Sequence, residues 1–167
     1  MTKILAIDPG YERVGIAVIE KLPKQKEVLR YSDCFKTLKE MELPARIALI
    51  GREIKKLITE YQPDRLAIEK LYFTTNQKTA MGVAEARGVI MYEGSLAGLT
   101  IHEYTPLEIK VAVTGYGKSD KKQMISMIPR LLKIDKNIAH DDEYDAIAVG
   151  ITCLAVSRSG SDEILRQ

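Results

Sequence analysis

The sequence predicts one α/β domain built on a five-stranded mixed sheet flanked by helices. Three strand-like segments near the N-terminus, separated only by turn residues, indicate an antiparallel meander. An amphipathic helix pattern then leads to a short apolar strand, and a strand reached through a helical crossover is most simply parallel to an earlier one. A chain of 167 residues, 46% hydrophobic and 29% charged, suits one globular domain. We expect residues 1–157 to form this domain and residues 158–167 to be a frayed tail.

The meander occupies the first part of the chain. Strands are expected at residues 3–7, 14–20 and 28–35, where apolar and β-branched residues predominate. The turn residues Asp8-Pro9-Gly10 and Pro23-Lys24 lie between them. Each strand can therefore fold back on the one before it.

The crossover follows at residues 43–61. Apolar side chains recur there every three or four positions, which is the spacing of an amphipathic helix, and Pro63-Asp64 ends it. Residues 65–68 are then a short buried strand. This order predicts the parallel part of the sheet.

Residues 76–97 form a second helical pattern, with apolar and small side chains on more than one face. Small residues let helices approach closely, so one side could meet the sheet and the other a second copy of the protein. A single deeply buried helix is the alternative.

One more strand and three helical segments complete the chain. Residues 99–104 predict the fifth strand, and Pro106 begins a short helix. Residues 119–133 have a helical pattern in which Pro129 should cause a kink or an early end, because a proline inside a helix removes a hydrogen bond and clashes with the preceding turn. The last helix is expected to begin near residue 141.

Composition also indicates the compartment. No segment resembles a signal peptide, and the longest apolar run, residues 146–156, is too short to cross a bilayer. We therefore expect a cytoplasmic protein without membrane contact. Cys34 and Cys153 lie in apolar segments without metal-type spacing, which predicts reduced thiols in the core.

The formal net charge of +2 hides a basic segment between residues 110 and 133. Its charged side chains are six cations and one acid, namely Lys110, Lys118, Lys121, Lys122, Arg130 and Lys133 with Asp120. A positive stretch in a protein whose candidate site is acidic fits a polyanionic substrate with phosphates to hold. A solvated helix face is the alternative.

Four carboxylates form the candidate site. Asp8 and Glu69 end apolar strands, at the place where a fold with a parallel sheet builds its sites. Asp142 and Asp145 lie three positions apart at the start of the last helix, so they point the same way. Asp141 and Asp145, four apart, would serve as well, and the neighbouring His140 is close enough to take part.

Carboxylate oxygens are the ligands that Mg²⁺ prefers, and Mg²⁺ typically keeps several waters. Two such ions, roughly 3.5–4 Å apart, can activate an attacking water and stabilise the leaving oxygen of a phosphodiester. Each acid alone has an ordinary explanation as a turn residue, a strand-end charge or a helix N-cap. The four acids together, placed at the ends of these strands and at the start of the last helix, predict a metal-dependent phosphodiesterase.

Five segments resemble, in order and spacing, the RuvC family of Holliday junction resolvases, and together they span nearly the whole chain. They are Ile7-Asp-Pro-Gly10 with Gly15, Ala67-Ile-Glu69, Glu85-Ala-Arg-Gly88, Gly115-Tyr-Gly-Lys-Ser-Asp-Lys-Lys-Gln123 and Asp142-Glu-Tyr-Asp-Ala-Ile-Ala148. The resemblance implies a ribonuclease-H-like fold, a homodimer, and paired symmetric nicks in a four-way DNA junction. It also implies two Mg²⁺ ions in each active site, with Mn²⁺ as a substitute, and work alongside a RuvAB-type branch-migration complex.

The resemblance assigns roles residue by residue. The catalytic and metal-binding acids it implies are Asp8, Glu69, Asp142 and Asp145. The DNA contacts it implies are Tyr72, with Phe73 beside it, and Lys110 and Lys121, with Lys118 and Lys122 beside them. Tyr72 stands where the family has a phenylalanine and keeps the stacking face of the ring.

Three other functions fit parts of the pattern. The segment from Asp8 to Gly15 also resembles the phosphate-binding hairpin of actin-like ATPases and sugar kinases, but those proteins need two such lobes. A catalytically silent junction-binding protein would be favoured by a missing acid, and none is missing. A YqgF-type nuclease shares the fold and acts in RNA processing. The basic glycine loop at residues 115–117 and the Asp142-x-x-Asp145 spacing favour the RuvC family instead.

Overall fold

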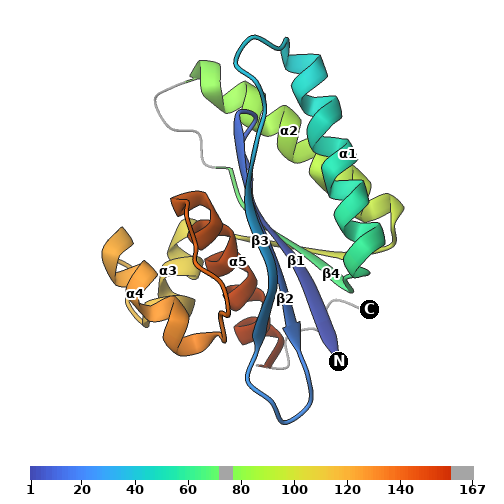
Figure 1. The fold of residues 1–167 in the computed structure, drawn as a ribbon. Helices are drawn as coiled ribbons and strands as arrows, with labels where there is room; N and C mark the ends of the chain where they lie inside the picture. The colour runs from blue at the N-terminus through green and yellow to red at the C-terminus, as the bar shows by residue number, and fades with distance from the viewer. Residues whose placement is uncertain (72–76, 159–167) are drawn as a thin grey trace, which may run out of the picture.

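The computed structural model describes residues 1–71 and 77–158 of the chain. A five-stranded sheet lies between two layers of helices (Figure 1). The elements in chain order are β1 (Thr2–Asp8), β2 (Arg13–Lys21), β3 (Val28–Lys36), α1 (Leu43–Tyr61), β4 (Arg65–Glu69), α2 (Gln77–Leu96), β5 (Thr100–Tyr104), α3 (Pro106–Thr114), α4 (Lys121–Leu131) and α5 (Asp141–Arg158).

The strands lie in the order β3-β2-β1-β4-β5. β1 pairs antiparallel with β2, and β2 with β3, which confirms the meander. On the other side β1 pairs parallel with β4, and β4 with β5. The predicted α/β class and the five-stranded mixed sheet are therefore confirmed, and α1 is the crossover that makes β4 parallel to β1.

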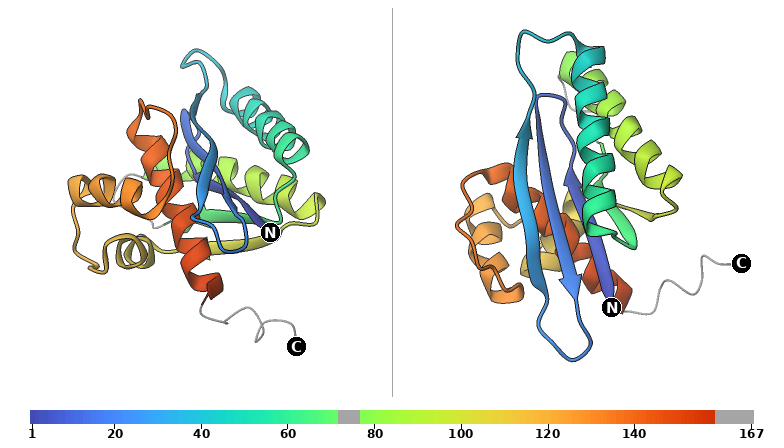
Figure 2. Two further views of the ribbon diagram at one scale, coloured as in Figure 1. Left: turned by 60° about the horizontal axis from the view of Figure 1, so that its bottom comes forward. Right: turned by 45° about the vertical axis from the view of Figure 1, so that its right-hand side comes forward.

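The two faces of the sheet carry different helices. α1 and α2 cover one face, and α3, α4 and α5 cover the other (Figure 2). Side chains alternate between the faces along each strand. In β1, Leu5 and Ile7 join the core cluster that includes residues of α1 and α2, whereas Ile4 and Ala6 join the cluster that includes residues of α5.

The helix between residues 119 and 133 is shorter than the sequence pattern predicts. The carboxylate of Asp120 accepts a hydrogen bond from the backbone N–H of Gln123, and the side chain of Gln123 accepts one from the backbone of Asp120. This capping box starts α4 at Lys121. The helix ends at Leu131, two residues after Pro129, so the early end expected from the proline is confirmed.

α2 is only partly buried. Its first expected residue, Asn76, lies outside the described residues, and the helix begins at Gln77. Its inward side packs on the sheet and α1, whereas its outward side exposes Met81, Tyr92 and Leu96 at 59 to 67%. Within this chain the helix is therefore not deeply buried, and the expected packing of its outward side on a second copy of the protein stays a prediction.

Cys34 and Cys153 are buried thiols, as expected. None of the helices in the described ranges has the length and apolar character needed to cross a membrane.

Candidate active site

Asp8 and Glu69 lie together because of the strand pairing. Ile7 of β1 pairs with Ile68 of β4 in the parallel register, so the two acids follow at the same edge of the sheet. Ala6 and Ala67 belong to the core cluster on the α5 side, and the alternation of side chains places the acids two positions later on that same side. Both carboxylates therefore face the layer that contains α5.

Gly15 lets the start of α5 reach these acids. It pairs with Asp8 across the antiparallel strands β1 and β2. A Cβ atom at Gly15 would lie 2.1 Å from the backbone oxygen of Asp142 and 3.1 Å from Cβ of Asp8. Only a residue without a side chain permits this approach, so the glycine fixes how closely Asp142 comes to the strand ends.

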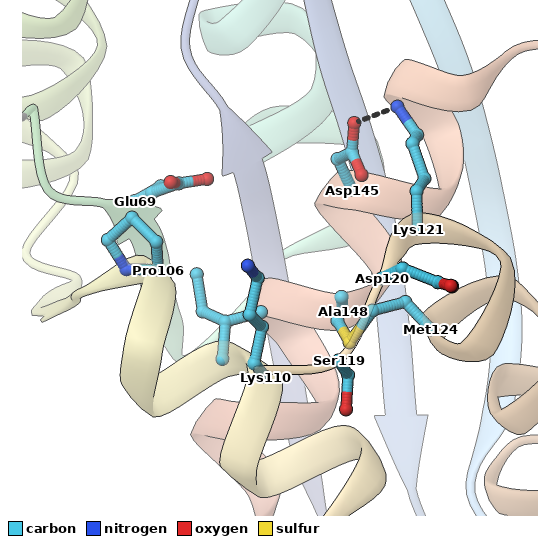
Figure 3. Close-up of a pocket in the computed structure, with 10 residues that line it drawn as sticks. Glu69, Pro106, Lys110, Ser119, Asp120, Lys121, Met124, Asp145 and Ala148 are labelled. Atoms are coloured by element: carbon cyan, nitrogen blue, oxygen red, sulfur yellow. Dashed lines mark hydrogen bonds and ion pairs between the residues drawn. The ribbon is translucent and has the colours of Figure 1, made fainter. Parts of the chain in front are cut away.

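The two acids of α5 are engaged by different cations. Asp142 forms an ion pair with Arg13, and Sγ of Cys34 lies 3.5 Å from the same carboxylate oxygen. Lys121 donates a hydrogen bond of 2.9 Å to Asp145 (Figure 3). Both carboxylates therefore have positive partners that a metal ion would have to replace.

Asp141 and His140 were the alternatives at the start of this helix. The side chain of Asp141 is 67% exposed and lies 3.4 Å from Nζ of Lys121. Nε2 of His140 lies 3.1 Å from Nζ of Lys36. The backbone of Asp142 abuts the Asp8–Gly15 strand pair, and the charge of Asp142 is one of those that raise the pKa of Asp8, so the geometry favours Asp142 as the partner of Asp8.

Crowding of negative charge shifts the ionisation of the strand-end acids. Burial raises the pKa of Asp8 to about 8, with repulsion from Asp145, Glu69 and Asp142 adding to the rise. Burial and Asp145 also raise the pKa of Glu69, while Lys110 acts in the opposite direction. The negative charge of this edge is therefore incompletely compensated by the protein, and a cation bound there would relieve it.

The donor set suits a hydrated Mg²⁺ ion. All four acids offer oxygen ligands only, and Mg²⁺ commonly uses one or two carboxylates and keeps several waters. Within residues 1–71 and 77–158, no three His, Cys, Asp or Glu side chains converge as a complete metal cage. Because Asp142 and Asp145 instead hold Arg13 and Lys121, the acids share an edge without converging on one point.

Beside the acids lies a pocket of about 330 Å³ between the sheet edge, α3, α4 and α5. It is lined by Glu69, Pro106, Ile109, Lys110, Ser119, Asp120, Lys121, Met124, Asp145 and Ala148. Figure 3 shows Lys110 reaching from α3 toward the side of the pocket where Glu69 and Asp145 lie. The structure thus brings Lys110 and Lys121 together with two of the predicted acids.

Among the described residues, two predicted DNA contacts do not line this pocket. Lys118 and Lys122 are exposed on the loop before α4 and on its first turn. Tyr72 and Phe73 lie outside the described residues.

Glu143 is a site residue that the sequence analysis missed. It is buried, and its carboxylate accepts hydrogen bonds from Ser32 Oγ (2.7 Å) and Lys136 Nζ (2.9 Å). It also accepts bonds from the backbone N–H groups of Ala139 (3.2 Å) and His140 (3.3 Å). Burial alone would raise the pKa of Glu143, but the bonds from Lys136 and Ser32 outweigh it and lower the pKa. Glu143 thus ties the start of α5 to β3, and the only sequence signal was an acid in the first turn of a helix.

Comparison with known proteins agrees with this arrangement. Residues 4–153 match the family described as crossover junction endodeoxyribonuclease RuvC. The RuvC protein of Petrotoga mobilis is 46% identical over 145 residues, which are 87% of this chain and 88% of that protein. The RuvC protein of Thermosipho melanesiensis is 44% identical over 154 residues, covering 92% of this chain and 97% of that protein.

Solved structures share the fold at lower identity. T. thermophilus RuvC in complex with a Holliday junction substrate has a TM-score of 0.89 and 23% identity, covering 96% of this chain and 98% of that one. The yeast mitochondrial Holliday junction resolvase Ydc2 has a TM-score of 0.70 and 12% identity, covering 98% of this chain and 82% of that one. These likenesses establish the ribonuclease-H-like fold, and the sequence matches establish that the chain belongs to the RuvC family of crossover junction endodeoxyribonucleases.

Proposed function

We propose that the protein resolves four-way (Holliday) DNA junctions by paired symmetric nicks, using metal-dependent hydrolysis of phosphodiesters. The observation that carries the proposal is the meeting of acids from β1, β4 and α5 at one sheet edge, where crowding and burial raise the pKa of Asp8 to about 8. Excess negative charge in a partly buried site is unfavourable unless a cation binds there.

Asp8, Glu69, Asp142 and Asp145 are the residues that would hold two Mg²⁺ ions. When bound, the metal would supply an activated water and stabilisation of the leaving oxygen. Asp142 and Asp145 would exchange their present partners, Arg13 and Lys121, for the metal. Those two cations would then be free to face the phosphates of the substrate.

DNA is held by cations around the pocket. Lys110 and Lys121 line it, and Lys118 and Lys122 are exposed nearby in the same basic segment. We assign these four lysines to phosphates. Tyr72, three residues after Glu69 in the sequence, would stack on a base at the junction centre, with Phe73 beside it.

A two-fold dimer would supply the second, symmetric nick. The exposed side of α2 supports it, because Met81, Tyr92 and Leu96 present large apolar side chains and Gly88 leaves open space between them. Light scattering tests this, and a monomer at micromolar concentration both free and on a junction would contradict it. In the cytoplasm such a dimer would work with a RuvAB-type branch-migration complex.

The deciding experiment is nick mapping. The purified protein is incubated with a synthetic four-way junction, a duplex of the same sequence and a structured RNA, each with Mg²⁺ or with EDTA. The expected result is paired nicks at symmetric positions of the junction with Mg²⁺ only. Mn²⁺ in place of Mg²⁺ should give the same nicks. Cutting of RNA alone would favour a YqgF-type activity, and tight junction binding without any nick would favour a purely binding role.

A further inference from the structure

The loop between α3 and α4 is held by an unusual number of hydrogen bonds for its length. Thr114 Oγ1 lies 2.5 Å from Ser119 Oγ and donates to the backbone oxygen of Lys110 at 2.8 Å. Ser119 Oγ and Ser119 N–H both donate to the backbone oxygen of Tyr116, at 2.7 and 3.2 Å. The N–H of Tyr116 donates to Thr114 Oγ1 at 3.1 Å. Both backbone polar groups of Tyr116 are therefore fixed.

Glycine makes this loop possible. Gly115 follows α3 with φ of 75°, a left-handed conformation that costs little only for glycine, and its N–H closes the helix on Val111. The chain then turns so that the buried hydroxyl of Ser119 lies under Tyr116. These contacts hold the backbone of Tyr116 in place.

That side chain is exposed. Tyr116 is 59% accessible, although its backbone N–H and carbonyl oxygen are both hydrogen-bonded. Leu107 and Val111, one helical turn apart on α3, are 61% and 47% accessible, and both lie next to Gly117 of the loop. Three of the large exposed hydrophobic residues therefore belong to α3 and the loop that follows it, with Tyr116 next in the chain to Gly117.

The surroundings of this exposed patch are cationic. Lys118 follows in the loop, and Lys110 lies on α3 one position from Val111. Lys110 and Ser119 also line the pocket that holds Glu69 and Asp145. Tyr116 thus presents an exposed aromatic ring on a segment that also carries Lys118 and that leads to a pocket lined by Lys110, Glu69 and Asp145. An aromatic ring and lysines on one segment suit a nucleobase and its phosphates better than they suit an apolar protein surface.

We propose that Tyr116 is a stacking subsite for an unstacked base of the DNA strand whose phosphates lie on Lys110 and Lys118. The inference rests on the proposed function, and it adds a second aromatic contact on the α3 side of the site. The hydrogen-bonded loop contributes by holding the ring in place before DNA arrives, so little conformational freedom is lost on binding.

Affinity measurements with a set of variants test the subsite. Tyr116→Ala should weaken junction binding about 5- to 150-fold, the range for loss of one base-stacking contact. Tyr116→Phe should bind like the wild type because it keeps the ring. Tyr116→Leu keeps apolar area but not the stacking face, so it should bind as weakly as Tyr116→Ala. Ser119→Ala keeps the ring but removes the hydrogen bond from Ser119 Oγ to the backbone oxygen of Tyr116. It should weaken junction binding less than Tyr116→Ala does.

Salt dependence distinguishes the ring from its charged neighbours. Stacking releases no counterions, so Tyr116→Ala should leave the slope of log affinity against log salt unchanged, whereas Lys118→Ala should lower it by about 1. A junction carrying 2-aminopurine near its exchange point gives a direct signal. Its fluorescence should be quenched on binding to the wild type and to Tyr116→Phe, and not to Tyr116→Ala.

The outcomes separate this inference from the proposed function. If the wild type prefers the junction over duplex and Tyr116→Ala binds and quenches like the wild type, the subsite is wrong and the function stands. If the wild type shows no preference for the junction but Tyr116→Ala still weakens DNA binding, the function fails and the subsite stands. Equal binding by Tyr116→Leu and Tyr116→Phe would also overturn stacking, because apolar area alone would then suffice. The exposed position of the ring means that all three variants should keep the thermal stability of the wild type.

Discussion

The backbone oxygen of Asp142 occupies the place where a side chain on Gly15 would begin, only 2.1 Å from an added Cβ. Gly15 pairs with Asp8, so this contact allows the start of the last helix to lie against the end of the first strand. The geometry of the acidic site is therefore determined by a residue that carries no functional group.

Gly15→Ala should displace the start of α5 and separate Asp142 from Asp8. We expect a loss of stability of about 1–3 kcal/mol, as for overpacking elsewhere, and a loss of cleavage larger than the loss of stability explains. Thermal unfolding and junction cleavage measure the two effects. Gly88→Ala is a control for stability alone: nothing lies within 4 Å of its added Cβ, so the helix should gain about 1 kcal/mol, whereas its cleavage also reports on the proposed dimer face of α2. Normal cleavage by Gly15→Ala would show that this contact does not set the site.

Asp8→Asn, Glu69→Gln and Asp145→Asn should each abolish cleavage while junction binding survives or tightens, since they remove ligands of the metal and negative charge near DNA. Gel-shift and cleavage assays with the same junction measure both properties.

Asp142→Asn should also lose cleavage, whereas Asp141→Asn, its exposed neighbour, should remain active. A reversal of this pair would move the fourth ligand to Asp141.

The metal-free protein should become less stable as pH rises from about 4 to about 8. The pKa of Asp8 is raised from 3.8 to about 8, so over this range the unfolded chain has lost a proton that the folded protein keeps. Between about pH 4 and pH 8 the free energy of unfolding therefore falls as the pH rises. Below about pH 4 Asp8 is protonated in both states, so its contribution no longer changes with pH. Thermal unfolding in EDTA between pH 4 and 9 should show the decline, and Asp8→Asn should remove most of it. Mg²⁺ should restore stability at pH 8 more than at pH 5, because bound metal needs ionised carboxylates.

The lysines should act on DNA through charge. Alanine at Lys118 or Lys122 should weaken binding to all junction sequences alike and lower the salt slope by about 1. Lys56→Ala is the control, since Lys56 lies on α1 in the opposite helical layer and pairs with Glu53. Unchanged slopes at both basic positions would identify the segment as a solvated face.

Glu143→Gln should destabilise the protein by about 1–3 kcal/mol, because it removes the charge of a buried carboxylate that accepts hydrogen bonds from Ser32 and Lys136. Glu53→Gln, which removes an ion pair of 3.0 Å to an exposed lysine, should cost less than about 1 kcal/mol. Chemical denaturation compares the two. Similar losses would mean that the buried network contributes no more than a surface pair.

Most of the fold could be predicted from the sequence because the signals are local. Turn residues mark the meander, the spacing of apolar residues marks α1, and a crossover of that length requires a parallel strand. The predicted helix at residues 119–133 was too long at its N-terminus because apolar periodicity says nothing of a cap. The hydrogen bond from Gln123 N–H to Asp120 decides that boundary.

The candidate acids could be predicted from their places at strand and helix ends, but their partners could not. Arg13 and Lys121 lie more than 20 residues from the acids they pair with, so no spacing rule reveals them. Glu143 was missed for the same reason, since its hydrogen bond to Ser32 joins residues 111 positions apart.

The separation of the acids along the chain has a consequence for how the activity arises. Asp8 belongs to the first strand and Asp145 to the last helix, so the site exists only after nearly the whole chain has been synthesised and the long-range contacts between β1, β4 and α5 have formed. Truncated or partly folded chains can carry the basic segment yet lack one or more of the proposed metal ligands. The proposed activity would therefore appear only in the fully folded chain.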